Sequence, residues 1–114
     1  MSITWHKIAD AASELTFPGN ELLDHEVAGK TVCLARKQGV LFAVAHKCPH
    51  SGAVMSEGWI DARGHLICPL HKYRFDMKNG RNVSGEGYVL KHWPVEERED
   101  GVYIGLDAVV DPGV

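Results

Sequence analysis

Cysteine is scarce in this sequence, with three in 114 residues. An odd, small number of cysteines predicts no framework of disulfides, and the first residues, MSITWHKIAD, lack the basic and apolar regions of an export signal. We therefore expect a reducing, cytoplasmic compartment, in which the cysteines remain free thiols. No apolar run approaches the roughly 20 residues that a membrane-spanning helix needs, so we expect no membrane association.

Positive charge is also sparse. The net charge is -3, and no run of basic residues occurs in the sequence, which argues against a nucleic-acid partner. A glycine-rich nucleotide fingerprint and the ligand set of a mononuclear iron enzyme are both lacking, so we expect a protein that is not itself an enzyme. With 45% hydrophobic and 24% charged residues, the chain has the composition of a globular protein. We predict a single domain over residues 1–114.

Most of the chain has the pattern of antiparallel β-hairpins. Residues 3–9 alternate in polarity, and residues 25–46 contain two β-rich runs broken at Gly29 and at residues 38–39. Residues 87–106 contain two more runs around Asp100 and Gly101. Residues 10–16 predict one short helical turn. The pattern predicts an all-β protein.

The middle of the chain departs from this pattern. Short extended pieces at residues 58–61 and 65–69 are joined by turn residues 62–64. We interpret residues 46–76 as a small unit inserted into the larger β domain.

Two similar fragments within this unit predict a metal site. HKCPHSG at residues 46–52 contains Cys48 and His50, and ICPLHKYRF at residues 67–75 contains Cys68 and His71. Zinc fingers usually group two cysteines in one knuckle and two histidines on a helix, whereas here each fragment supplies one of each. Such interleaving suits a two-iron cluster with both cysteines on one iron and both histidines on the other. A structural zinc site stays open as an alternative.

These fragments resemble the Rieske [2Fe-2S] proteins, whose pattern is C-x-H followed, after about fifteen to seventeen residues, by C-x-x-H. The similarity extends over residues 30–80. It implies an antiparallel Rieske-type β-sandwich with an inserted cluster-binding subdomain of two ligand loops. It also implies one [2Fe-2S] cluster, with Cys48 and Cys68 on the inner iron and His50 and His71 on the outer iron.

The remaining histidines, cysteine and tryptophans have simpler interpretations. We expect the other histidines to be surface or hydrogen-bonded residues and the tryptophans to be packing residues. Cys33 lies in an alternating run that turns it toward the core, so we leave it out of the site. The residues with these interpretations are His6, His25, His46, His65, His92, Trp5, Trp59 and Trp93.

The resemblance is closest to the low-potential, ferredoxin-like branch of the family. Respiratory members carry a disulfide between the two loops and hydroxyl donors to the cluster. This chain has Ala53 and Leu70 at the disulfide positions, and Tyr73 and Phe75 at the serine and tyrosine positions. We therefore expect a reduction potential in the lower part of the Rieske range of roughly -150 to +300 mV. A third loop, around residues 85–87, lacks the proline that is frequent in the family.

The resemblance implies a role in electron transfer. We expect a ferredoxin, monomeric in isolation, that carries single electrons from a flavin reductase to a terminal oxygenase. Two alternatives are the small Rieske-like subunit of an assimilatory nitrite reductase and a structural zinc module that binds proteins. We expect partners to dock on a small apolar patch around the ligand loops. Its predicted members are Pro49, Ala53, Met55, Pro69 and Leu70.

Overall fold

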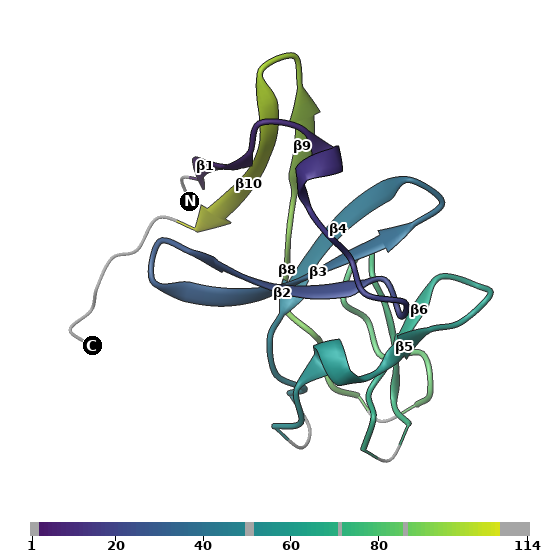
Figure 1. The fold of residues 1–114 in the computed structure, drawn as a ribbon. Coiled ribbons are helices and arrows are strands. Elements are labelled where there is room, and N and C mark those ends of the chain that lie inside the picture. Colours follow the sequence, from purple (N-terminus) through teal and green to yellow (C-terminus); the bar gives the residue numbers. More distant parts are fainter. Residues whose placement is uncertain (1–2, 50–51, 71, 86, 108–114) are drawn as a thin grey trace.

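Strands make up nearly all of the regular structure (Figure 1). The computed structural model describes residues 3–49, 52–70, 72–85 and 87–107. Two short 3-10 helices, η1 (Ala12–Glu14) and η2 (Met55–Glu57), are the only helical segments of these residues. The strands are β1 (Ile3–Ala9), β2 (Leu22–Val27), β3 (Lys30–Lys37), β4 (Val40–Ala45), β5 (Trp59–Ile60), β6 (His65–Ile67), β7 (Arg74–Asp76), β8 (His92–Trp93), β9 (Val95–Arg98) and β10 (Gly101–Asp107).

The strands form three antiparallel sheets. One has the order β1-β10-β9, the second β2-β3-β4-β8 and the third β5-β6-β7. The first two form the β domain, and the third lies within the inserted unit. This arrangement confirms the all-β, antiparallel fold that the sequence predicts.

The four-stranded sheet separates two hydrophobic cores. On β3, Val32 and Leu34 lie in the core shared with β10, whereas Cys33 and Ala35 lie in the core shared with the inserted unit. All four side chains are buried, because successive residues of a strand point to opposite faces and both faces are covered here. The sheet is therefore the common support of the β domain and the inserted unit.

Two tight turns fix the register of this sheet. Ala28 and Gly29 join β2 to β3, and Gln38 and Gly39 join β3 to β4. Both residues of each turn have positive φ, 51° followed by 81°. Two-residue turns of this kind match the twist of antiparallel strands. The predicted hairpin boundaries at Gly29 and at residues 38–39 are confirmed.

Other sequence-based expectations have mixed outcomes. The helical turn predicted for residues 10–16 is η1, and the tail at residues 108–114 lies outside the described residues. Trp93 is buried, as expected, but Trp59 is 43% exposed, so its interpretation as a packing residue was wrong. Trp59 lies on the two-residue strand β5, at the edge of the inserted sheet. No helix among the described residues is long and apolar enough to span a membrane.

Asn20 connects the β domain to the inserted unit. Its side-chain nitrogen donates to the carbonyl oxygens of Ser56 at 2.8 Å and Gly58 at 3.0 Å. Its side-chain oxygen accepts from the backbone N–H of Leu22 at 3.3 Å, at the start of β2. One half-buried side chain therefore holds η2 and the residue that follows it against the four-stranded sheet.

We predict that Asn20→Ala lowers the free energy of unfolding by about 1–3 kcal/mol, because it leaves two carbonyl groups without their donor. Chemical denaturation of the purified protein measures this difference. Asn79→Ala is the matched control, since the Asn79 side chain makes one exposed local hydrogen bond, to the N–H of Arg81. Equal losses in the two variants would contradict the role of Asn20 as a connection.

Candidate metal centre

The first ligand loop spans residues 48–53 and is closed by backbone pairing. Lys47 and Val54 form an antiparallel bridge on either side of it. Within the loop, the N–H of Cys48 donates to the carbonyl of Ala53 at 2.8 Å, and the N–H of Gly52 donates back to the carbonyl of Cys48 at 2.9 Å. These bonds hold Cys48 at the base of the loop.

The second ligand loop spans residues 68–73 and has the same construction. Ile67 pairs with Arg74, where β6 meets β7. The N–H of Cys68 donates to the carbonyl of Tyr73 at 2.8 Å, again five residues farther along the chain. Each cysteine is therefore the first residue of a loop of the same length, closed by the same hydrogen bond.

The two loops also match in backbone conformation. Their fifth residues, Gly52 and Lys72, have positive φ values of 75° and 57°. Glycine adopts this conformation freely, whereas a residue with a side chain loses roughly 1–2 kcal/mol there. The strain at Lys72 indicates that the shape of the loop is imposed by its closing bonds. Figure 1 shows both loops at the same end of the molecule, below the inserted sheet.

Both cysteines are free thiols in one buried cluster. The exposed fractions are 3% for Cys48 and 0% for Cys68, and both belong to the core on the inserted-unit face of the four-stranded sheet. Met55 and Phe75 complete this part of the core. Two buried thiols without a disulfide, each at the base of a rigid loop, fit a metal centre that needs two inward-facing thiolates.

The two predicted histidine ligands, His50 and His71, lie outside the described residues, so they stay predictions. Their positions in sequence are the third residue of the first loop and the fourth of the second. A group of three or more metal-binding side chains is not found among the residues with described positions. The ligand set of Cys48, His50, Cys68 and His71 is therefore carried forward as a proposal.

Cys33 is buried with the two loop cysteines but has a different chemistry. Burial, and then the negative charge of Asp24, raise the pKa of its thiol to about 12. Its Sγ lies 3.9 Å from the carbonyl oxygen of Leu34. At neutral pH the free thiol is protonated, and Cys33 lies on β3, outside both ligand loops. The expectation that Cys33 turns toward the core is confirmed.

A third loop packs on the second ligand loop. The N–H of Val83 donates to the carbonyl of Arg74 at 2.9 Å, and the N–H of Arg74 donates to the Ser84 hydroxyl at 3.1 Å. Farther along, the ring of Tyr88 stacks on that of Tyr73, with centroids 6.1 Å apart. Sequence reasoning missed this contact, because no spacing rule connects two tyrosines on different loops. This stack holds the third loop, which lacks proline, against the second ligand loop.

The predicted docking patch needs a correction. Met55 is 0% exposed and packs in the core with both cysteines, and Ala53 is half-buried against the same core. Met55 lies on η2, which turns inward over the four-stranded sheet. Met55 and Ala53 therefore stabilise the site from inside. Pro49 is exposed, Pro69 is half-buried and Leu70 is 46% exposed.

Two of the other histidines are hydrogen-bonded or paired, as expected. His46 Nδ1 lies 3.2 Å from Asp24 Oδ1, and Ser56 donates to the second oxygen of Asp24 at 2.9 Å. His65 Nδ1 lies 3.4 Å from Asp61 Oδ2. Both pairs lie beside the ligand loops.

Comparisons with known proteins agree with this site. The model of the Rieske [2Fe-2S] domain matches residues 4–94. The ferredoxin component of a naphthalene 1,2-dioxygenase system from Pseudomonas aeruginosa is 33% identical over 101 residues, which cover 88% of this chain and 96% of that protein. This chain therefore belongs to the Rieske [2Fe-2S] domain family, and one Rieske-type cluster is its cofactor.

Solved structures agree in fold. A protein assigned as the NADH-dependent nitrite reductase small subunit of Mycobacterium tuberculosis superposes with a TM-score of 0.79, over 94% of this chain and 98% of that one, at 24% identity. A chain from the complex of reduced oxygenase and oxidized ferredoxin in carbazole 1,9a-dioxygenase has a TM-score of 0.74 and 25% identity, over 94% and 97% of the two chains. The first of these likenesses concerns the fold alone.

Gly58 provides a test of the packing behind the cysteines. A Cβ atom at Gly58 would lie 1.9 Å from the carbonyl oxygen of Ile67, the residue before Cys68. We predict that Gly58→Ala destabilises the protein by about 1–3 kcal/mol, because it displaces this backbone. We also predict less bound iron per chain after purification.

Gly19→Ala is the control for this variant, because a Cβ at Gly19 meets nothing within 4 Å. Iron analysis and thermal denaturation of the two variants measure the difference. Full iron content and unchanged stability in Gly58→Ala would show that the position of Ile67 is not critical for the second loop.

Proposed function

We propose that this chain is the ferredoxin component of an oxygenase system, which accepts single electrons from a flavin reductase and passes them to a terminal oxygenase. In this proposal Cys48, His50, Cys68 and His71 hold the cluster, and the chain itself catalyses no chemical reaction. We also propose that residues 1–114 act as one domain in the cytoplasm, where three free thiols are compatible with the redox conditions.

The observation that carries this proposal is the pair of matched loops, each with a buried cysteine at its first position. The likeness to a dioxygenase ferredoxin, over 96% of the length of that protein, supports an electron carrier. The likeness to a chain from a ferredoxin–oxygenase complex supports an oxygenase as the partner. We infer that the loop end of the molecule is the end at which electrons are exchanged.

The bound cluster would supply one site for a single electron, at a potential that two imidazole ligands raise above that of a four-cysteine cluster. The residues of the chain determine the surroundings of that site. Cys48 and Cys68 are shielded from water on the core side by Met55 and Phe75, both with an exposed fraction of 0%. Phe75 has no hydroxyl group to donate to the cluster, which favours a potential in the lower part of the Rieske range. That low potential stays a prediction.

A nitrite reductase small subunit is the second candidate function. It rests on the similarity of the fold, which the protein from M. tuberculosis shares over 94% of this chain. The oxygenase proposal is preferred, because its relative exceeds 30% identity over nearly the full length. A structural zinc module would need the same four ligands, and metal analysis distinguishes it directly.

We predict two irons and two acid-labile sulfides per chain, and no stoichiometric zinc, in protein purified without oxygen. Cys48→Ser and Cys68→Ser should each lose the iron, whereas Cys33→Ala should keep it, because Cys33 lies on β3, outside both ligand loops. Elemental analysis and visible absorption measure these contents. One zinc per chain in place of iron would exclude electron transfer as the function.

We predict that Leu70→Asp slows reduction by the flavin reductase about tenfold without changing the absorption spectrum of the cluster, because it places a charge on an apolar contact surface. Ile3→Asp is the control, since Ile3 is similarly exposed, 47% against 46%, but lies on β1 in the β domain. Stopped-flow reduction measures both rates. Equal reduction rates in wild type and Leu70→Asp would show that the docking surface does not include the second loop.

A further inference from the structure

The charge of this chain is unevenly distributed. Residues 61–81 contain five lysines and arginines and two aspartates, whereas the rest of the sequence contains seven basic and thirteen acidic residues. Residues 61–81, which include the second half of the inserted unit, are thus positive in a chain whose net charge is -3. Such segregation produces a local field that the net charge does not describe.

Three of these cations, together with Lys37 of β3, line two adjoining cavities. A cavity of about 350 Å³ lies between the β3–β4 turn and the inserted unit, and Lys37, Arg63 and Lys78 line it. A second cavity of about 330 Å³ is lined by Arg63 and Arg74. Both cavities share Ala62 and Arg63, so the four cations form one continuous surface. We call it the basic surface, and it consists of Lys37, Arg63, Arg74 and Lys78.

Among the described residues, no ion pair joins a cation of the basic surface to a carboxylate. Elsewhere in the described structure Lys7, Arg36 and Arg98 each pair with an acidic side chain. In contrast, Arg63 and Lys78 have no such pair among the residues whose positions are described, and both are exposed.

The two aspartates beside the basic surface accept hydrogen bonds from backbone N–H groups of the turns in which they lie. Asp61 accepts from the N–H groups of Arg63 and His65, both at 2.9 Å, and Asp76 accepts from the N–H of Lys78 at 2.8 Å. Burial favours the neutral form of Asp61, but these N–H groups and His65 hold its pKa below the usual value. Lys37 Nζ donates to the Asp61 carbonyl at 3.2 Å, a bond that leaves its charge uncompensated.

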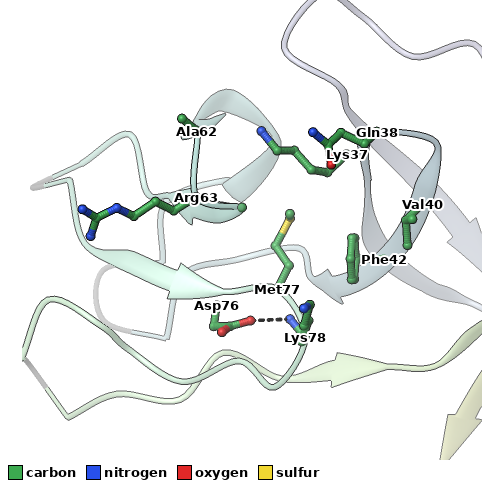
Figure 2. A pocket seen from close by; sticks show the side chains of 10 residues that line it. Lys37, Gln38, Val40, Phe42, Ala62, Arg63, Asp76, Met77 and Lys78 are labelled. Atoms are coloured by element: carbon green, nitrogen blue, oxygen red, sulfur yellow. Dashed lines mark hydrogen bonds between the residues drawn. The ribbon is translucent and has the colours of Figure 1, made fainter.

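Apolar side chains also line the larger cavity. Val40 is 54% exposed, Phe42 is partly exposed, and Met77 is buried. Figure 2 shows Lys37 on one side of Met77 and Ala62 with Arg63 on the other, whereas the Arg63 guanidinium points outward from Met77. An apolar depression with cations at its rim combines the two features by which proteins recognise an acidic partner surface.

We propose that the basic surface is a docking surface for a partner protein with an acidic face, whose carboxylates meet the cations while an apolar side chain enters the cavity between Val40 and Met77. Arg74 directly follows the second ligand loop, so a protein docked here lies beside the proposed electron-exchange end. Only the identification of the partner as a redox protein rests on the proposed function.

The acidic β9–β10 hairpin favours a protein over a nucleic acid as the occupant. This hairpin, at the top of Figure 1, carries Glu96, Glu97, Glu99 and Asp100, and it lies apart from the β3–β4 turn that contributes to the basic surface. This separation of charge would orient the basic surface toward an acidic protein and repel a long polyanion. The expected result is faster association with the acidic partner, together with strong dependence on salt.

A binding experiment on the cluster-loaded full chain tests the proposal without any electron transfer. The probe is a fluorescein-labelled peptide, ELEFEE, and a version with every Glu replaced by Gln is its neutral control. Fluorescence anisotropy should detect the acidic peptide only, with affinity falling as salt rises from about 20 to about 300 mM. Arg63→Glu with Lys78→Glu should weaken binding at least about tenfold.

Lys7→Glu with Lys30→Glu is the matched control, since it changes the net charge equally in the β domain, and its affinity should stay within about twofold of wild type. Equal loss in both double variants would overturn the proposal, because net charge alone would then explain binding. Tighter binding of a single-stranded DNA of the same charge would assign the surface to nucleic acid. Displacement of the peptide by inorganic phosphate at the same concentration as the peptide would overturn the proposal, because the basic surface would then be a simple anion site.

Discussion

The hydrogen bond between the N–H of each loop cysteine and a carbonyl five residues later is the constraint on which this site depends. It occurs twice, from Cys48 to Ala53 and from Cys68 to Tyr73, at 2.8 Å in both loops. Because each bond fixes the backbone beside a cysteine, both thiols stay buried in one core without a covalent bridge. Hydrogen bonds of the protein backbone therefore fix the positions of both cysteines, which lowers the entropic cost of ordering them as ligands.

The four-stranded sheet supplies the rigid support for these loops. Its β3 strand buries Cys33 and Ala35 against the inserted unit, and Val32 and Leu34 against the β1-β10-β9 sheet. Only two residues separate the end of β4, at Ala45, from Cys48, so the first loop is attached closely to the sheet. Asn20 adds a second connection, through the carbonyls of Ser56 and Gly58. The acidic hairpin and the basic surface lie on different parts of this frame, so their separation is a property of the fold.

Local patterns in the sequence predict much of the fold. Alternating polarity and two-residue turns predict the β2–β3–β4 meander, because both features depend on neighbours in the chain. Contacts between distant residues were not predictable in the same way. Met55 was expected at the surface and is buried, since a short 3-10 helix gives no periodic signal, and the Tyr73–Tyr88 stack joins two separate loops. The basic surface was also missed, because its cations come from three segments and the sequence contains no run of basic residues.

Two matched loops that hold one cluster through Cys48, His50, Cys68 and His71 should give its two irons different ligands. A Mössbauer spectrum of the protein grown on iron-57 measures this difference, because the method resolves iron atoms with different ligands. We expect two iron signals of equal intensity, one typical of an iron with thiolate and sulfide ligands and one of an iron with nitrogen ligands in place of the thiolates. A single type of iron, with the same ligands at every site, would contradict the assignment of Cys48 and Cys68 to one iron and His50 and His71 to the other.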